Sequence, residues 1–334
     1  MKLLKLVLVF FIAGSSFLYA QNPDRIFVGY EVLENSVKIA VDKGTYVFQP
    51  YTSEIMETNF IPEGETRDTV SHAVILIPEK VLFTVSEDNA SVKIDSEGID
   101  VLITKKPFRI QYFFNEEPVV SEKTGYFKDE THEKIEFNLE EEEVLFGGGA
   151  RALGMNRRGN RLELYNRAHY GYEERSELLN FTLPIVLSSN KYMLHFDNAP
   201  IGFLDLDSRN DNSLTYETIS GRKTYQLIVG DTWERILENY TLLTGRQPLP
   251  PRWTFGNFSS RFGYHSQEEV METIVKFKND SIPVDAVILD LFWFGHEIQG
   301  TMGNLEFVRD SFPEPRKMIE DLKQQGVKTI LVTE

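Results

Sequence analysis

The chain has 334 residues, more than one hydrophobic core usually accommodates, so we expect at least two domains. It contains no cysteine, which excludes a disulfide scaffold and a thiolate metal site. The formal net charge of −16 argues against a nucleic-acid partner, because nucleic-acid binding depends on cations that neutralise phosphate. This charge suits a solvated protein that acts on a neutral or cationic ligand, and solubility alone is the more ordinary explanation for it.

The first twenty residues have the pattern of a secretory signal peptide. Lys2 and Lys5 precede an apolar run over residues 6–13, and small residues lead to Ala20. The run is short for a membrane span. We therefore expect cleavage after Ala20, a periplasmic or secreted location, and no stable membrane insertion of the mature chain. Leu18 stands where a small residue is usual, and an uncleaved membrane anchor is the alternative.

Residues 21–230 have the pattern of many short β-strands. Apolar and polar residues alternate in several runs that turn residues separate. The apolar positions of three such runs are Val37, Ile39 and Val41; Val92 and Ile94; and Ile135, Phe137 and Leu139. Residues 115–118 are predicted to turn an aromatic strand back on itself. This spacing favours a β-sandwich over a doubly wound sheet.

A glycine-rich loop over residues 146–151 is followed by several arginines. Glycines and arginines together can hold a phosphate. The Gly-Lys-Ser/Thr ending of a phosphate loop is absent, however, and so is the Gly-x-Gly-x-x-Gly spacing of a dinucleotide site. We therefore expect a packed loop whose arginines pair with Glu163, Glu173 or Glu174.

Residues 231–251 are predicted to link two domains. A helix is expected to start at Asp231, as its cap, and to end at Gly245. The proline-rich residues 246–251 then form a stiff boundary.

Residues 252–334 alternate between strand and helix patterns. Strands are predicted over residues 253–258, 284–289 and 327–332, and helices from Ser266 and from the proline pair at 313 and 315. This order predicts parallel strands with right-handed crossovers. Asp290 follows the second strand directly, and barrel folds place their active sites at this end of the strands.

Four ordered blocks span the second half of the chain. They are residues 147–151 with 156–159 and 163–166; 248–253 with 260–264; 282–285 with 290–293; and 312–315 with 325–328. Together they resemble glycoside hydrolase family 31, the retaining α-glucosidases, α-xylosidases and related transglucosylases. Residues 290–295 and 300–305 look most like its bacterial oligosaccharide 4-α-glucosyltransferase branch.

The resemblance implies a multidomain β and α/β fold. A β-sandwich similar to galactose mutarotase would occupy residues 21–230, and the first three strands of a truncated (β/α)8 TIM barrel would occupy residues 252–334. It also implies a site. Asp290 would bind sugar hydroxyls in the −1 subsite, Phe262 would line the same pocket, and Leu291 and Phe292 would shape the wall that decides between glucose and xylose. The alternative for Asp290 is a carboxylate that caps the next segment.

Retaining glycosidases need two carboxyl groups about 5–5.5 Å apart, one as nucleophile and one as acid/base. In the family that this chain resembles, both lie on later barrel strands, which would be beyond Glu334. We therefore expect no catalytic residue here, and a chain that is an N-terminal fragment of a glycosidase or transglucosylase acting on maltooligosaccharides. The resemblance implies an oligosaccharide substrate and neither a metal nor an organic cofactor.

Two departures from the family pattern argue against a standard maltase specificity. Ala168 stands where many α-glucosidases have an aspartate, and Tyr170 or Tyr172 is the candidate replacement. Phe307 and Val308 stand where Trp-Asp is common.

Three other functions are weighed against this one. The first is a non-catalytic carbohydrate-binding relic of the same family. The second is an aldose epimerase, which needs a histidine and a glutamate on one sheet; the settings of the histidines at positions 72, 132, 169 and 195 do not suggest it. The third is metal catalysis, but His265 and His296 lack the His-Glu-x-x-His spacing.

Overall fold

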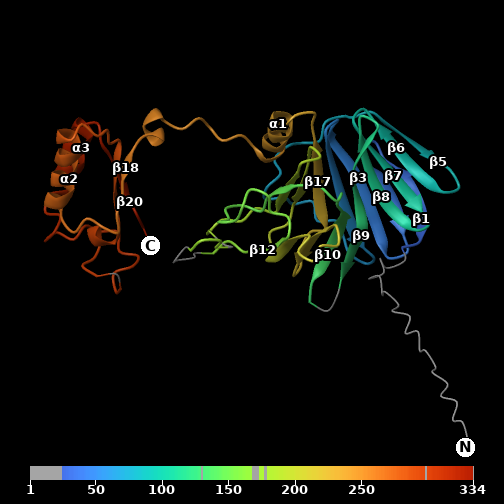
Figure 1. The fold of residues 1–334 in the computed structure, drawn as a ribbon, viewed down its shortest axis with the longest axis horizontal. Coiled ribbons are helices and arrows are strands. Elements are labelled where there is room, and N and C mark those ends of the chain that lie inside the picture. Colours follow the sequence, from blue (N-terminus) through green and yellow to red (C-terminus); the bar gives the residue numbers. More distant parts are fainter. Residues whose placement is uncertain (1–24, 129–130, 168–172, 177–178, 298, 334) are drawn as a thin grey trace, which may run out of the picture. The chain divides into compact units, whose positions relative to one another are not determined.

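The computed structural model describes residues 25–333, except 129–130, 168–172, 177–178 and 298. The predicted signal peptide therefore lies outside the described residues, as do His169, Tyr170 and Tyr172. The chain divides into two compact units, Met1–Arg246 and Gln247–Glu334. Each is described by itself (Figure 1).

The first unit is a sandwich of two antiparallel sheets. Sheet A has eight strands in the order β1 (Phe27–Val32), β2 (Val37–Val41), β3 (Gly44–Thr52), β4 (Ile55–Pro62), β17 (Thr224–Val229), β14 (Tyr192–Phe196), β13 (Ile185–Ser188) and β11 (Leu145–Gly147). Sheet B has nine strands in the order β12 (Asn160–Leu164), β15 (Gly202–Leu206), β16 (Ser213–Thr218), β10 (Glu133–Asn138), β9 (Glu117–Lys128), β8 (Phe108–Phe114), β7 (Ile99–Lys105), β6 (Ser91–Ser96) and β5 (Phe83–Glu87). The predicted sandwich is thus confirmed.

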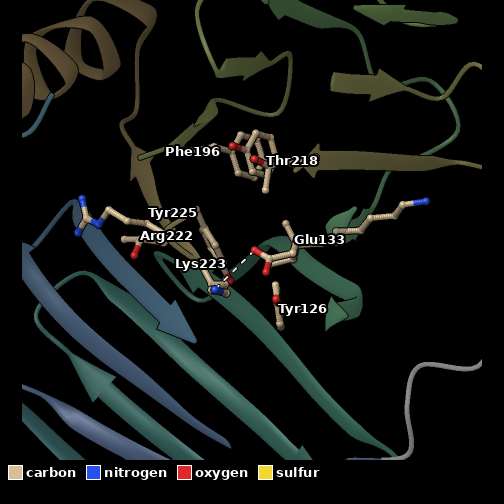
Figure 2. Close-up of a pocket in the computed structure, with 11 residues that line it drawn as sticks. Tyr126, Glu133, Phe196, Thr218, Arg222, Lys223 and Tyr225 are labelled. Carbon is tan, nitrogen blue, oxygen red and sulfur yellow. Dashed lines mark ion pairs between the residues drawn. The ribbon is translucent and has the colours of Figure 1, made fainter. Parts of the chain in front are cut away.

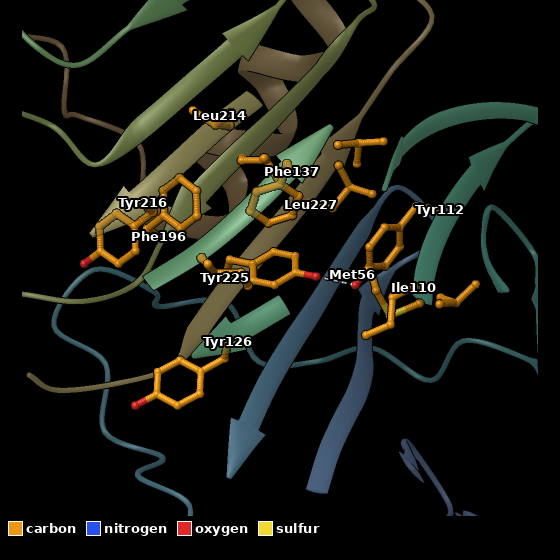
Figure 3. Packing of buried hydrophobic residues seen from close by; sticks show 14 of the residues in the cluster. Met56, Ile110, Tyr112, Tyr126, Phe137, Phe196, Leu214, Tyr216, Tyr225 and Leu227 are labelled. Atoms are coloured by element: carbon orange, nitrogen blue, oxygen red, sulfur yellow. Dashed lines mark hydrogen bonds between the residues drawn. The ribbon is translucent and has the colours of Figure 1, made fainter. Parts of the chain in front are cut away.

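Alternation along the strands explains why the two sheets pack. In β2 the residues predicted to be apolar, Val37, Ile39 and Val41, are all buried, while the residues between them are half-buried. The turn predicted at residues 115–118 joins β8 to β9, with Asn115 and Glu116 at φ 54° and 68°. Aromatic side chains from both sheets fill the space between them (Figure 3).

A chain of polar side chains crosses this core. Thr58 Oγ1 lies 2.7 Å from Tyr112 Oη, and Tyr112 Oη lies 2.6 Å from Tyr225 Oη. Tyr225 donates in turn to Glu122 Oε1 at 2.7 Å, and Tyr46 donates to Glu122 Oε2 at 3.3 Å. Successive members come from opposite sheets, so the hydrogen bonds tie sheet A to sheet B.

Glu122 is buried, and burial raises its pKa to about 7, although the Tyr225 hydroxyl and the nearby Arg25 charge lower it. Arg25 is buried beside it: its Nη1 donates to Tyr46 Oη, and its guanidinium lies 4.1 Å from the centre of the Phe60 ring. The start of the described chain is therefore fixed inside the sandwich.

A third layer covers the outer face of sheet A. Helix α1 (Trp233–Thr244) packs there with Ile236 and Leu243 against apolar residues of the strands. Its cap is Thr232, whose side chain accepts from Arg235 N at 3.2 Å, so the prediction that Asp231 caps the helix is wrong. A threonine one position later offers an equivalent acceptor, and the sequence does not separate the two.

Residues 67–76, which we call the strap, also lie on this face. They have no regular secondary structure. Arg67 Nη2 donates to Glu57 Oε1 at 2.8 Å, Ser71 Oγ donates to Asp197 Oδ1 at 2.9 Å, and the Ile75 N–H donates to Leu243 O at 2.9 Å. The strap is therefore bound to the sheet and to α1.

The second unit has three parallel strands, β18 (Phe258–Ser259), β19 (Ala286–Leu289) and β20 (Lys328–Leu331), in that order. Helix α2 (Gln267–Asn279) connects β18 to β19, and α3 (Pro315–Gln324) lies before β20. The predicted barrel opening is confirmed. The predicted strand 253–258 is mostly wrong: Arg252–Phe255 form the 3₁₀ turn η1, and only Phe258 and Ser259 pair with β19.

Within the described residues, no helix is long and apolar enough to cross a membrane.

Candidate functional site

Asp290 lies at the carboxyl end of β19, as predicted. It is half-buried and begins the 3₁₀ turn η2 (Leu291–Trp293), where its Oδ1 accepts from Leu291 N at 2.8 Å. The capping role that was the alternative is therefore present. Among the described residues its Oδ2 accepts no hydrogen bond, and a carboxylate has about four acceptor positions, so the cap leaves room for a ligand's hydroxyls.

Two aromatic side chains lie next to each other at the same edge. Phe262 follows β18 and is 63% exposed, and Phe292 is in η2 after β19. Their ring centroids are 6.2 Å apart at an interplanar angle of 72°. Because β18 and β19 are parallel neighbours, the segments that follow them emerge at one edge of the sheet. The structure thus brings Phe262 and Phe292 together beside the end of β19.

Leu291 differs from the other three predicted site residues. It is 5% exposed and belongs to the apolar cluster of the second unit, with Trp293 and Phe294. Trp293 is fixed further by a hydrogen bond from its Nε1 to Val332 O at 2.9 Å. Leu291 therefore packs inward under the edge where Phe262 and Phe292 lie, and its effect on a ligand stays a prediction.

The sequence reasoning missed the role of His265 at this edge. Its ring centroid lies 4.1 Å from that of Phe292, at an angle of 33°. The two roles that the sequence suggests for a histidine, metal ligand and epimerase base, do not include an aromatic contact of this kind. No spacing rule relates position 265 to position 292, because the contact depends on the pairing of β18 with β19.

The arginines after the glycine-rich loop bind acids and carbonyls of the protein itself. Arg151 donates to Glu163 O at 2.6 Å, and Arg167 pairs with the Glu163 carboxylate at 2.7 Å, as predicted for this residue. The other pairs differ from the prediction: Arg158 pairs with Asp207 at 2.9 Å and Arg161 with Glu217 at 3.0 Å. These bonds favour the packed loop over a phosphate site.

A cavity lies between the two sheets of the sandwich (Figure 2). Its lining includes Tyr126, Glu133, Thr218 and Lys223. Its volume is ≈ 20 Å³, which suits one water molecule and not a sugar ring. Glu133 Oε2 is buried there without a hydrogen bond, 3.5 Å from Lys223 Nζ, and a water in this cavity would satisfy it.

The structure does place a histidine and a glutamate on one face of sheet A. His195 Nδ1 lies 2.8 Å from Gln226 Oε1, and Gln226 Nε2 donates to Glu57 Oε2 at 2.8 Å. Burial lowers the pKa of His195, against the nearby Asp197 charge. His195 and Glu57 are 3% and 2% exposed, so an epimerase substrate could not contact them in this conformation.

Within the residues that the structure describes, no three or more His, Asp or Glu side chains gather closely enough to hold a metal ion.

Comparison with known proteins defines the class. The sequence profile of the glycosyl hydrolase 31 N-terminal galactose mutarotase-like domain matches residues 45–205, and that of the glycosyl hydrolases family 31 TIM-barrel domain matches residues 247–334. The fold and both profiles define a glycoside hydrolase architecture. The chain belongs to glycoside hydrolase family 31.

Several relatives carry α-glycosidase names. Alpha-glucosidase 2 of Bacillus thermoamyloliquefaciens is 28% identical over 94% of this chain and 40% of its own length. An alpha-xylosidase of Saccharolobus solfataricus is 30% identical over 58% of this chain and 26% of its own length. The chain therefore spans less than half the length of these relatives, and neither name is that of the predicted glucosyltransferase branch.

Among solved structures, a family 31 dextranase of Flavobacterium johnsoniae, complexed with isomaltotriose, has the same fold. Its TM-score is 0.85 at 24% identity, with 93% of this chain and 38% of that chain covered. An α-xylosidase from a soil metagenome, complexed with xylose, gives a TM-score of 0.79 at 18% identity, with 92% and 47% covered.

Proposed function

We propose that the protein containing this chain is a retaining glycoside hydrolase or transglucosylase that acts on α-glucosides, with maltooligosaccharides as substrates. The observation that carries the proposal is the edge formed by Asp290, Phe262 and Phe292 at the carboxyl ends of β18 and β19 in a member of family 31. The α-glucosidase and α-xylosidase names of its relatives support the substrate class.

In this proposal the described residues bind the substrate. The Asp290 carboxylate accepts sugar hydroxyls through the oxygen that its cap does not use. The rings of Phe262 and Phe292 offer apolar surface to the faces of a pyranose. The nucleophile and the acid/base are proposed to come from outside residues 1–334, and no metal or organic cofactor takes part.

Hydrolysis and transfer differ only in the second half of the reaction, where water or a sugar hydroxyl accepts the glycosyl group. The likeness of residues 290–295 and 300–305 to the 4-α-glucosyltransferase branch supports transfer, and we propose an exported protein on the signal-peptide pattern. A non-catalytic sugar-binding protein is the alternative.

The test is chromatography of products from maltotriose, with the purified chain and the intact protein compared. We expect no turnover by the chain and turnover by the intact protein. Release of glucose alone would indicate hydrolysis, and longer products would indicate transfer. Turnover by the chain would show that our placement of the catalytic pair is wrong. An intact protein that binds maltotriose without turnover would favour the non-catalytic alternative.

A further inference from the structure

Phe292 is held from three sides by one short loop, residues 261–265. The centroid of the His265 ring lies 4.1 Å from that of Phe292, and the centroid of the Phe262 ring lies 6.2 Å from it at an interplanar angle of 72°. Between these two residues is Gly263, where a Cβ atom would overlap the Phe292 ring. Only a residue without a side chain fits at position 263, because the loop backbone lies directly against the Phe292 ring. The rings of Phe262 and His265 contact Phe292 from the same loop.

A carboxylate in the first turn of α2 fixes this loop. Glu269 Oε2 accepts from the His265 N–H at 2.6 Å, and Glu269 Oε1 accepts from Arg261 Nη2. Arg261 Nε also donates to Gly263 O at 3.0 Å. Both ends of the loop are thus bound to one side chain, which we call the Glu269 bracket.

The Glu269 carboxylate that forms the bracket is charged at neutral pH. Burial acts to raise the pKa of Glu269, but the His265 N–H bond and the Arg261 charge outweigh it, and the pKa lies below its ordinary value. The helix N-terminus adds a favourable field for the same charge. His265 Nδ1 lies 3.5 Å from Glu269 Oε2, so the bracket also orients the imidazole ring that lies on Phe292.

We propose that His265 is a positioning residue of the sugar site: its ring, oriented by Glu269, holds Phe292 in the orientation that walls the subsite. The inference rests on the proposed function. Phe292 is half-buried, and without the His265 ring one of its faces would be free. The χ1 rotation of Phe292 would then move the wall that distinguishes one sugar from another. The aromatic ring of His265 performs this role, and its charge does not.

The kinetic test uses the intact protein and two substrates, p-nitrophenyl α-glucoside and p-nitrophenyl α-xyloside. For His265→Ala we expect KM to rise about threefold to tenfold, the range of an aromatic pair, with a changed glucoside-to-xyloside ratio of kcat/KM. His265→Phe keeps a ring at this position and should restore both values. The matched control is His72→Ala, an exposed histidine of the strap, which should leave both unchanged.

A second readout does not depend on turnover. In the chain with isotope-labelled phenylalanine, we expect a nuclear Overhauser effect between the rings of His265 and Phe292, and a shift of the Phe292 ring signals in His265→Ala but not in His265→Phe. If the wild-type protein cleaves neither substrate, the proposed function fails while this readout still decides the positioning role.

Three results would overturn the inference. The first is the absence of the ring–ring effect in the wild-type chain. The second is a His265→Ala enzyme with unchanged KM and unchanged sugar ratio. The third is a loss of thermal stability in His265→Ala without any change in the ratio, which would make His265 a purely structural residue.

Discussion

The two units bury their apolar surface in different ways. The sandwich packs two sheets face to face, and its aromatic core draws residues from both. The second unit has a three-stranded sheet whose apolar cluster includes Val270, Ile274, Met318 and Leu322 of its two helices. All four residues of β20 are only half-buried. The two sheets of the sandwich thus enclose a core between them, and we call this unit closed. The second unit has a single sheet in the described residues, which leaves β20 half-buried, and we call this unit open.

This difference bears on where the proposed sugar site lies. The closed unit has a chain of hydrogen bonds through its core. The cavity between its two sheets is too small for a sugar ring. The open unit carries the exposed aromatic rings and the strand-end carboxylate. Side chains that follow strand ends are free to contact ligands, because the strands behind them supply the rigid support.

The largest effect should come from truncating the sandwich core. Phe137 is fully buried, with its ring 5.1 Å from that of Tyr225 at 89°. Phe137→Ala should lower the free energy of unfolding by about 3–5 kcal/mol, because a cavity remains in a packed core. The control, Phe255→Ala, removes a ring that is 70% exposed and should have little effect. Urea denaturation measures both, and equal losses would contradict a closed sandwich core.

The buried Glu122 should make the sandwich pH-dependent. Its folded pKa of about 7 exceeds the ordinary 4.5, so the folded state binds the proton more tightly than the unfolded state. The free energy of unfolding should therefore fall as the pH rises from about 4.5 to 7, by on the order of 3 kcal/mol from this group. Glu122→Gln keeps an acceptor for Tyr225 and should remove this slope. Urea titrations at pH 5 and pH 8 measure it, and an unchanged slope would refute the assignment.

In the open unit, Asp290→Asn should reduce activity without unfolding. The amide oxygen can still accept from Leu291 N, so the η2 cap is retained. We expect kcat/KM of the intact protein to fall about 100-fold, since a lost positioning group costs this much. Asp280→Asn, at the exposed end of α2, is the control. Full activity of Asp290→Asn would leave only the capping role for this residue.

The smallest effect concerns two equivalent helix caps, one in each unit. Ser266 accepts from Glu269 N at 3.1 Å, and Thr232 accepts from Arg235 N at 3.2 Å. Replacing either with alanine should cost about 1 kcal/mol. Hydrogen exchange should show the loss on α2 for Ser266→Ala and on α1 for Thr232→Ala. If one substitution lowered the hydrogen-exchange protection of both helices, the two units would not unfold independently, and the prediction would be wrong.

Local patterns predicted most of the fold. The alternation in β2, the turn at residues 115 and 116, and the Ser266 cap each depend on neighbours in sequence, and the structure has all of them. The Glu269 side chain accepts from the N–H of His265, whereas an ordinary capping box would place its partner one residue later, on the Ser266 cap. The strand expected at 253–258 failed because aromatic composition indicates β-propensity but supplies no partner strand.

The candidate site was predictable in part. Asp290 could be found because a carboxylate directly after an apolar strand is a local signal. The contact of His265 with Phe292 could not, because it joins residues that only strand pairing brings together. The inward packing of Leu291 was equally hidden, since an apolar residue after a strand can face either the core or the ligand.

The strap belongs to the sandwich domain, although a definition of the domain by helices and strands alone would leave it out. A protein engineer who shortened the domain would first delete this stretch between β4 and β5, because it contains neither helix nor strand. That deletion would uncover the Glu57 carboxylate and strip α1 of its backbone partners at Leu243. A shortened version of this domain should therefore keep the strap and shorten exposed turns instead.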